Sequence, residues 1–210
     1  MPGVLLTGFE PFAGDATNPS GDAVRLVAER WGEPEPLATA VLPVSFDTAA
    51  AQLRQLIATH DPDVVICTGL AGGRSGISVE RVAVNLIDAR IPDNAGDQPV
   101  DTRSVADGPA AWFSTLPVKA IAAAVAGSGI PCTLSLSAGT YVCNHVFAHA
   151  VDAVRPGARA RFIHVPWAAG QAPHGEPELP IDDIARALVI AVRTALDVHQ
   201  DTATPGGTLH

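Results

Sequence analysis

The stretch SAGTYVCNHVFAHA, residues 137–150, places a cysteine where a nucleophile could be activated. Small residues lead from an apolar run into Cys143, and apolar residues at helical spacing follow it. The pattern predicts a strand, a turn and a helix, with Cys143 in the first helical turn. N–H groups at a helix N-terminus stabilise a thiolate, lower its pKa and can hold an oxyanion beside it. A cysteine is more often a quiet core residue, so both interpretations remain open at this point.

A thiolate nucleophile requires a general base within hydrogen-bond reach, and the chain contains seven histidines. His164 lies at the carboxyl end of the apolar run RFIHVPW, where it would share a sheet edge with Cys143. The others stand in a last helical turn, on a helix face, in a loop or near the tail: His60, His145, His149, His174, His199 and His210. His145 and His149 are four residues apart, but no third ligand motif accompanies them, so we expect no metal site.

A carboxylate often orients such a base, and Glu80 is the candidate. It interrupts the segment ISVERVAVNL, where an acid among valines is costly unless it is paired or solvated. Its partner could be the base, or Arg81 or another surface arginine. Arg90 closes the same segment and could hold the backbone, pair with Asp88 or face a developing negative charge.

Two glycine-rich turns follow apolar runs, TGFEPFAGDATNPSG and TGLAGGRSG. Neither contains G-x-G-x-x-G or the GK[ST] ending of a phosphate loop, so we expect no nucleotide cofactor. Phe9 and Phe12 lie in the first turn, and two phenylalanines there need something apolar to cover. This favours the lining of a small-ligand site over a tight turn alone. Asn18 could add polar contacts, although its simpler role is to cap the following helix.

These residues depend on elements that bring the ends of several strands together. Apolar runs predict strands at 4–9, 37–44, 63–69, 77–90, 132–137 and 159–167, with helices at 19–30, 48–60, 117–127, 142–154 and 181–196. Asp47 is expected to cap the second helix, and residues 92–111 read as a loop. Alternating strands and helices indicate an α/β fold of three layers, α/β/α, with a central twisted, mixed, mainly parallel sheet.

The chain length and composition favour one globular catalytic domain over residues 1–200, followed by a flexible tail at 201–210. Hydrophobic residues make up 47% of the 210 and charged residues 17%, which is typical of a globular chain. No apolar run approaches the ~20 residues that span a bilayer. The N-terminus MPGVLLTGFEPF lacks a basic cluster and is interpreted as a first strand, not a signal peptide.

Charge and cysteine content limit the partners and the compartment. The net charge is −9 and Lys119 is the only lysine, which argues against nucleic acid or an anionic membrane as partner. Cys67, Cys132 and Cys143 cannot all pair, and the first two lie inside strand runs and are interpreted as small core residues. We therefore expect reduced thiols in the cytoplasm.

Four stretches together resemble the cysteine-type pyroglutamyl peptidases, also called pyrrolidone-carboxylate peptidases. They are LLTGFEPFAGDATNPSG, GLAGGRSGISVERVAVNLIDARIPDN, SAGTYVCNH and FIHVPW, in the family's order across nearly the whole chain. The resemblance implies a cytosolic, cofactor-free, phosphorylase/hydrolase-like α/β/α enzyme that commonly forms homotetramers. It assigns the catalytic triad to Glu80, Cys143 and His164.

The resemblance also implies a pocket for the lactam ring of the substrate. The residues it assigns there are Phe9, Phe12, Asn18, Tyr141 and Val142, with Arg90 close to the reacting centre. Two positions depart from the family pattern, because Leu70 replaces a glutamine and Tyr141 replaces the commoner phenylalanine. The tyrosine keeps a ring face, whereas losing a hydrogen bond to the substrate at position 70 can cost ~1–3 kcal/mol.

The expected activity is removal of an N-terminal pyroglutamyl residue from peptides through a thioester, and the expected partner is a peptide beginning with pyroglutamate. One alternative is a cysteine hydrolase of another small amide, which Leu70 suggests. A second is a non-catalytic binding protein on the same fold. The complete set of Glu80, Cys143 and His164 argues against the second alternative.

Overall fold

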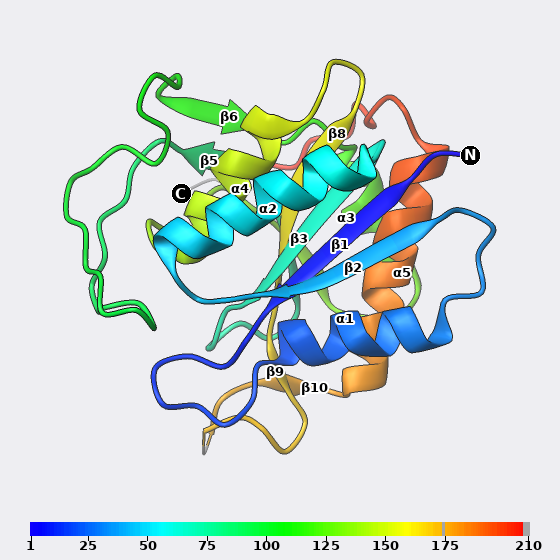
Figure 1. Cartoon of the computed structure of the whole chain (residues 1–210). Helices are drawn as coiled ribbons and strands as arrows, with labels where there is room; N and C mark the ends of the chain where they lie inside the picture. The colour runs from blue at the N-terminus through cyan, green and yellow to red at the C-terminus, as the bar shows by residue number, and fades with distance from the viewer. Residues whose placement is uncertain (174, 208–210) are drawn as a thin grey trace.

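The computed structural model describes residues 1–173 and 175–207. At its centre lies a six-stranded sheet with the order β2-β1-β3-β8-β4-β7 (Figure 1). Its strands are β1 (Val4–Phe9), β2 (Leu37–Leu42), β3 (Val64–Leu70), β4 (Ile77–Glu80), β7 (Cys132–Ser135) and β8 (Arg159–Val165). All neighbours run parallel except β4 and β8, which are antiparallel. The predicted mixed, mainly parallel sheet is confirmed.

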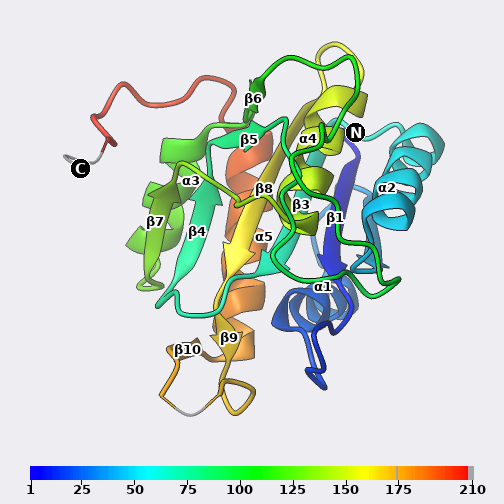
Figure 2. The same cartoon turned by 90° about the vertical axis from the view of Figure 1, so that its left-hand side faces the viewer.

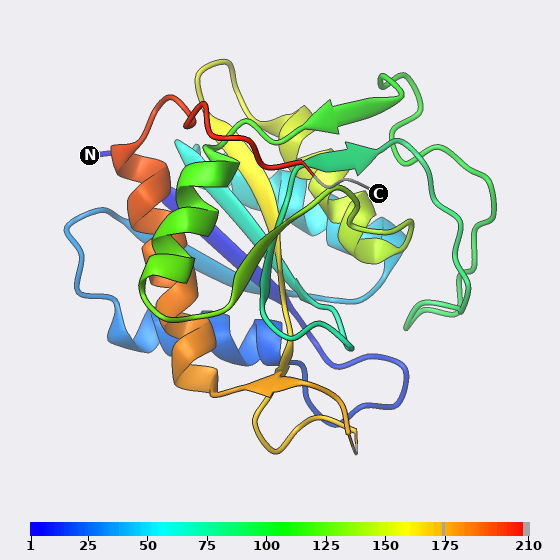
Figure 3. The same ribbon diagram turned by 180° about the vertical axis from the view of Figure 1, so that it is seen from behind.

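Helices cover both faces of this sheet, which confirms the three layers. One face packs against α1 (Pro19–Arg30), α3 (Val118–Gly127) and α5 (Ile181–Asp197), seen from behind in Figure 3. The other packs against α2 (Phe46–His60) and α4 (Val142–Ala153), in front of the sheet in Figure 1. Alternation along the strands supplies both cores, because Val4 and Leu6 face one layer while Leu5 faces the other.

The segment predicted as one extended strand at 77–90 is divided in the structure. β4 ends at Glu80, and β5 (Val82–Val84) leaves the main sheet to pair with β6 (Ala111–Phe113) as an antiparallel ribbon. A second small ribbon joins β9 (Trp167–Ala168) to β10 (Glu178–Leu179). The short strands β6 and β10 were not predicted, because each has only two or three residues and is defined by its pairing with another segment.

One helix is capped by a residue next to it in the sequence, and another by a residue from a distant loop. Asn18 caps α1 as predicted, because its Oδ1 accepts a hydrogen bond from the Ser20 N–H at 3.1 Å. The predicted cap of α2 is wrong. That helix begins at Phe46, so Asp47 lies inside its first turn, and the Phe46 N–H donates instead to Asp93 Oδ2 at 2.9 Å. The acceptor comes from the long loop between β5 and β6, which no local pattern could reveal.

β7 forms one edge of the sheet, on the left in Figure 2, and β2 forms the other. Within the described part of the chain, no helix is long and apolar enough to cross a membrane. The predicted tail begins with Asp201, whose carboxylate accepts N–H bonds from Lys119 and Ala120 at the start of α3. The last three residues of that tail, and His174, lie outside the described residues.

Candidate active site

Cys143 occupies the first turn of α4, as the pattern predicted. The first N–H groups of this helix have no intrahelical acceptor and are available to a negative charge beside Cys143. Gly69, near the end of β3, makes room for it, since a methyl group built on Gly69 would lie 2.7 Å from Cys143 Sγ. The sulfur therefore rests directly over the sheet, at the carboxyl ends of the parallel strands.

His164 and Glu80 form a buried hydrogen-bonded pair. His164 Nδ1 lies 2.8 Å from Glu80 Oε1, and the side chains are 5% and 0% exposed. β8 and β4 run antiparallel here, which brings together two residues 84 positions apart. Arg74 Nη1 donates to the same Glu80 oxygen at 2.8 Å. Of the partners that the sequence left open for Glu80, the structure gives it the histidine and an arginine of the glycine-rich loop, and not Arg81.

The charges of this pair determine the tautomer of the imidazole. Burial alone would raise the pKa of Glu80, but the His164 hydrogen bond and the Arg74 guanidinium lower it overall. Burial lowers the pKa of His164, and Glu80 only partly opposes this. At neutral pH Glu80 is an acceptor-only carboxylate and His164 is neutral, so Nδ1 must carry the proton. Nε2 is thereby left with its lone pair free to act as a base.

The predicted lowering of the Cys143 pKa is wrong. Burial raises the pKa of its thiol to about 12, the Glu80 carboxylate raises it further, and Arg74 opposes both. Cys143 keeps some exposed surface at the cavity mouth, but burial and the Glu80 carboxylate disfavour its thiolate. The resting site therefore holds a neutral thiol beside a neutral imidazole.

A cavity of about 170 Å³ opens beside the sulfur. Its walls are mostly apolar and come from both glycine-rich turns, the segment after β2, the start of α4 with the residues before it, and the end of β8: Phe9, Phe12, Asn18, Val44, Leu70, Ala138, Tyr141, Val142, Cys143 and His164. Tyr141 is held by its hydroxyl, which donates to the Pro92 carbonyl at 3.0 Å, and its ring contacts those of Phe12 and Phe46. The cavity suits a small, flat ligand with one reactive group near the sulfur.

The structure thus brings the residues predicted for the site together around one cavity, except Arg90. Arg90 is exposed and lines a neighbouring cavity that shares Phe12 and Tyr141 with the first. Asn18 uses Oδ1 as the helix cap, and its Nδ2 donates to the Glu10 carbonyl at 2.9 Å. Because an amide nitrogen carries two hydrogens, one donor remains for a ligand.

Gly69 and Arg74 were not singled out by sequence reasoning, although both belong to the turn TGLAGGRSG. A charged side chain inside a glycine-rich turn that follows a buried strand was the available signal for Arg74. Gly69 gave no local signal, because its importance depends on the sulfur that packs over it from α4.

The other histidine pair serves packing instead of chemistry. His145 lies 2.8 Å from the Ser104 hydroxyl, and burial lowers its pKa to about 3. His149 accepts from Arg54 Nε at 2.7 Å. Across residues 1–173 and 175–207, no group of three or more His, Cys, Asp or Glu side chains is arranged to hold a metal ion.

Known proteins share this sequence and fold. Residues 3–198 match the family model described as pyroglutamyl peptidase. The pyrrolidone-carboxylate peptidases of Clavibacter michiganensis and Klebsiella pneumoniae are 49% and 47% identical to this chain, over all of both proteins in each case. A crystal structure of pyroglutamyl peptidase I from Bacillus amyloliquefaciens superposes with a TM-score of 0.92 at 42% identity, covering 98% of this chain and 100% of that one. The chain belongs to the pyroglutamyl peptidase family.

Proposed function

We propose that this protein is a cysteine peptidase that removes an N-terminal pyroglutamyl residue from peptides, with Cys143 as nucleophile, His164 as general base and acid, and Glu80 as the orienting carboxylate. The observation that carries the proposal is the cavity lined by both Cys143 and His164, with Glu80 bonded to the far side of the imidazole. The matched family and the similar pyroglutamyl peptidases support the substrate.

The chemistry begins with a neutral pair and not with an ion pair. His164 Nε2 takes the proton of the Cys143 thiol as the sulfur attacks the carbonyl carbon of the pyroglutamyl residue. The resulting oxyanion is held by N–H groups in the first turn of α4. Proton transfer and attack occur together, because a free thiolate is disfavoured by burial and by Glu80.

The protonated imidazole then donates its proton to the leaving amine, the C–N bond breaks and a thioester remains. Water attacks the thioester while His164 takes a proton from it, and breakage of the C–S bond releases pyroglutamate. The proton on His164 returns to the sulfur. Throughout, the buried Glu80 carboxylate stabilises the imidazolium, and the hydrogen bonds from His164 and Arg74 keep that carboxylate ionised.

The cavity beside Cys143 fits the lactam ring of the substrate. The rings of Phe9, Phe12 and Tyr141 are proposed to pack on the flat ring, with Val142 closing one side. The free N–H of Asn18 is available to the lactam carbonyl, and Arg90 acts from the adjoining cavity. A pyroglutamyl N-terminus has no charged amine, so a mostly apolar pocket suits it.

Leu70 lines this cavity and supports one alternative, hydrolysis of another small amide by the same three residues. A leucine cannot offer the hydrogen bond that a glutamine offers there, and a polar group of the lactam would lose a partner. The alternative predicts that pyroglutamyl amides are turned over poorly while a different small acyl amide is turned over well.

A fluorogenic pyroglutamyl amide, assayed beside its prolyl analogue under reducing conditions, tests the proposal. We expect release of the fluorophore from the first only, and a loss in Cys143→Ala on the order of 10³-fold or more. Cys67→Ala removes another buried thiol, which lines neither the cavity beside Cys143 nor the adjoining one, and should keep the activity. Turnover that survives Cys143→Ala would reject the mechanism.

We further propose that the protein acts in the cytoplasm as a homo-oligomer, a tetramer by resemblance to its family. Three free cysteines support a reducing compartment. Light scattering after size-exclusion chromatography measures the oligomer directly, and a monomer at micromolar concentration would contradict the tetramer.

A further inference from the structure

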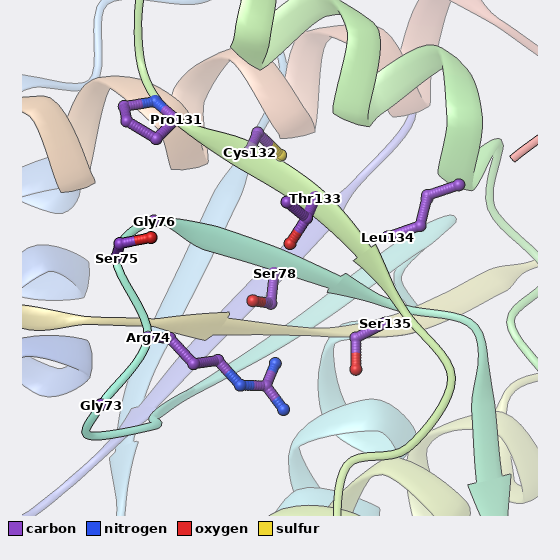
Figure 4. A pocket seen from close by; sticks show the side chains of 10 residues that line it. All are labelled: Gly73, Arg74, Ser75, Gly76, Ser78, Pro131, Cys132, Thr133, Leu134 and Ser135. Atoms are coloured by element: carbon purple, nitrogen blue, oxygen red, sulfur yellow. The ribbon is translucent and has the colours of Figure 1, made fainter. Parts of the chain in front are cut away.

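A second cavity, of about 380 Å³, lies on the face of the sheet beyond the His164–Glu80 pair. It extends over the edge strand β7 and its neighbour β4, and Figure 4 shows the residues that surround it. Half of its lining residues have polar side chains, and most of them are small: Gly73, Arg74, Ser75, Gly76, Ser78, Pro131, Cys132, Thr133, Leu134 and Ser135. Its volume falls within the ~300–1,000 Å³ usual for ligand sites.

Strand register places this cavity in line with the nucleophile. Gly69 pairs with His164, His164 pairs with Ser78, and Ser78 pairs with Thr133. Paired residues on neighbouring strands face the same side of a sheet, so these four form one row across four strands. The row spans three strand spacings, about 14 Å. Cys143 Sγ sits over Gly69 at one end, and the second cavity lies at the other.

The side chains of β7 separate into two directions, as its alternation requires. Thr133 and Ser135 project to the side of Ser78 and Arg74, whereas Cys132 and Leu134 project the other way, toward α3 (Figure 4). Two segments connect the cavities. Leu70 lines the first and Gly73 the second, while Ala138 lines the first and Ser135 the second.

Reaction geometry then determines which part of a substrate reaches the second cavity. If Cys143 attacks a carbonyl held in the first cavity, the leaving nitrogen must lie within reach of His164, because His164 protonates it. The leaving segment therefore departs over His164, away from the first cavity. Following the row, the next surface that it meets is formed by Ser78 and Thr133.

We propose that the second cavity binds the leaving segment of the substrate, namely the peptide backbone that follows the scissile bond. This rests on the proposed function. The hydroxyls of Ser75, Ser78 and Thr133 can donate to and accept from backbone amides of any sequence, whereas that of Ser135 already donates to the Ser137 carbonyl. No aromatic residue lines the cavity and Leu134 is its largest apolar residue, so it recognises the length of the peptide more than its side chains.

The test compares substrates that differ only beyond the scissile bond. Pyroglutamyl p-nitroanilide reaches the first leaving position, whereas pyroglutamyl-Ala-Ala-Ala amide extends into the cavity. Thr133→Trp fills the cavity without touching the triad, since Thr133 is exposed and lies at the far end of the row. Leu136→Trp is the matched control, because Leu136 is 56% exposed and lines neither cavity.

We expect kcat/KM for the tetrapeptide amide to fall about tenfold in Thr133→Trp, the effect of losing one or two hydrogen bonds. The anilide should be unaffected in both variants, and Leu136→Trp should resemble the wild type with both substrates. Equal effects on the two substrates, or none, would overturn the leaving-segment site while the proposed activity stands. A wild-type protein that cleaves neither compound would reject the activity and this site with it.

Discussion

At the scale of single residues, burial and the Glu80 carboxylate oppose the Cys143 thiolate that a helix terminus would favour. The helix start offers donors, but burial and the Glu80 carboxylate raise the pKa of the thiol to about 12. The donors are therefore of most use to the oxyanion that forms during the reaction and not to a resting thiolate.

This difference is visible in the pH dependence of alkylation. Because the Cys143 pKa is raised, its rate of reaction with iodoacetamide should keep rising from about pH 6 to about pH 9, without the plateau of a preformed thiolate. Mass spectrometry of peptides separates Cys143 from Cys67 and Cys132. A rate that is already constant below about pH 7 would show that the thiol and imidazole form an ion pair at rest.

Gly69 leaves room for the Cys143 sulfur because it has no side chain. In Gly69→Ala the new methyl would lie 2.7 Å from Cys143 Sγ and 2.9 Å from Phe162 Cζ, so the sulfur must move. We expect kcat to fall on the order of 10²-fold, with a smaller change in KM.

The control for Gly69 is Gly127→Ala at the end of α3, where a methyl would meet no atom within 4 Å. It should leave kcat unchanged. Thermal denaturation checks that both variants fold, and a folded Gly69→Ala protein with wild-type kcat would contradict the positioning role.

At the scale of elements, the loop between β5 and β6 is tied to the start of α2 by one buried carboxylate. Asp93 accepts the N–H of Phe46 at 2.9 Å, that of Ala95 at 2.8 Å and that of Asp97 at 2.9 Å. Burial would raise the pKa of Asp93, but these backbone donors lower it overall. The carboxylate thus organises its own loop and caps a helix 47 positions away.

Replacing this carboxylate should cost more than replacing the acid next to the helix start. We expect Asp93→Asn to lower the free energy of unfolding by ~1–3 kcal/mol at neutral pH, because one buried oxygen no longer accepts. Asp47→Asn, in the same first turn of α2 but exposed, should cost less, within ~1 kcal/mol. Urea denaturation of both variants measures the difference.

The sign of the pH effect follows from the lowered pKa of Asp93. Its stabilisation is complete above the unfolded value of ~3.9 and is lost as the pH falls through the lower folded value. The gap between wild type and Asp93→Asn should therefore close in acid. A gap that is equal at neutral pH and below about pH 3 would argue against the carboxylate.

At the scale of the whole molecule, the buried Arg161 lowers the free energy of unfolding, and the packing of the rest of the core must offset this. It is 0% exposed in β8, and none of its three guanidinium nitrogens has a hydrogen-bond partner among the described residues. Burial lowers the pKa of Arg161 to about 9, which leaves it charged at neutral pH. A buried charge without partners opposes folding.

We expect Arg161→Met to raise the free energy of unfolding by about 1 kcal/mol or more at neutral pH. Because the folded pKa lies near 9 and the unfolded one above 12, the wild type sheds this penalty as the pH rises through 9. The advantage of the variant should therefore shrink at about pH 10.

Arg159, on the same face of β8, provides a matched control. Its guanidinium donates to the carbonyls of Ala195 at 2.6 Å and Val198 at 3.0 Å, at the end of α5. Arg159→Met should therefore lower the free energy of unfolding. Urea denaturation measures both variants. If Arg161→Met and Arg159→Met lower the free energy of unfolding equally, Arg161 has stabilising partners in the folded protein.

The sequence by itself determined the features that depend on interactions between residues close together in the chain. Hydrophobic periodicity located the main strands and the five helices of the described residues, the cap of α1 could be read from Asn18, and Cys143 was assigned to the first turn of α4. Alternating strands and helices were sufficient for the three layers. These features depend on residues within a few positions of one another.

Only the tertiary structure decided the features that join distant segments. These are the antiparallel pairing of β4 with β8, the Arg74–Glu80–His164 contacts, the capping of α2 by Asp93 and the raised pKa of Cys143. Each depends on which groups share a buried space, and burial strengthens or penalises charge through neighbours that no window of sequence contains.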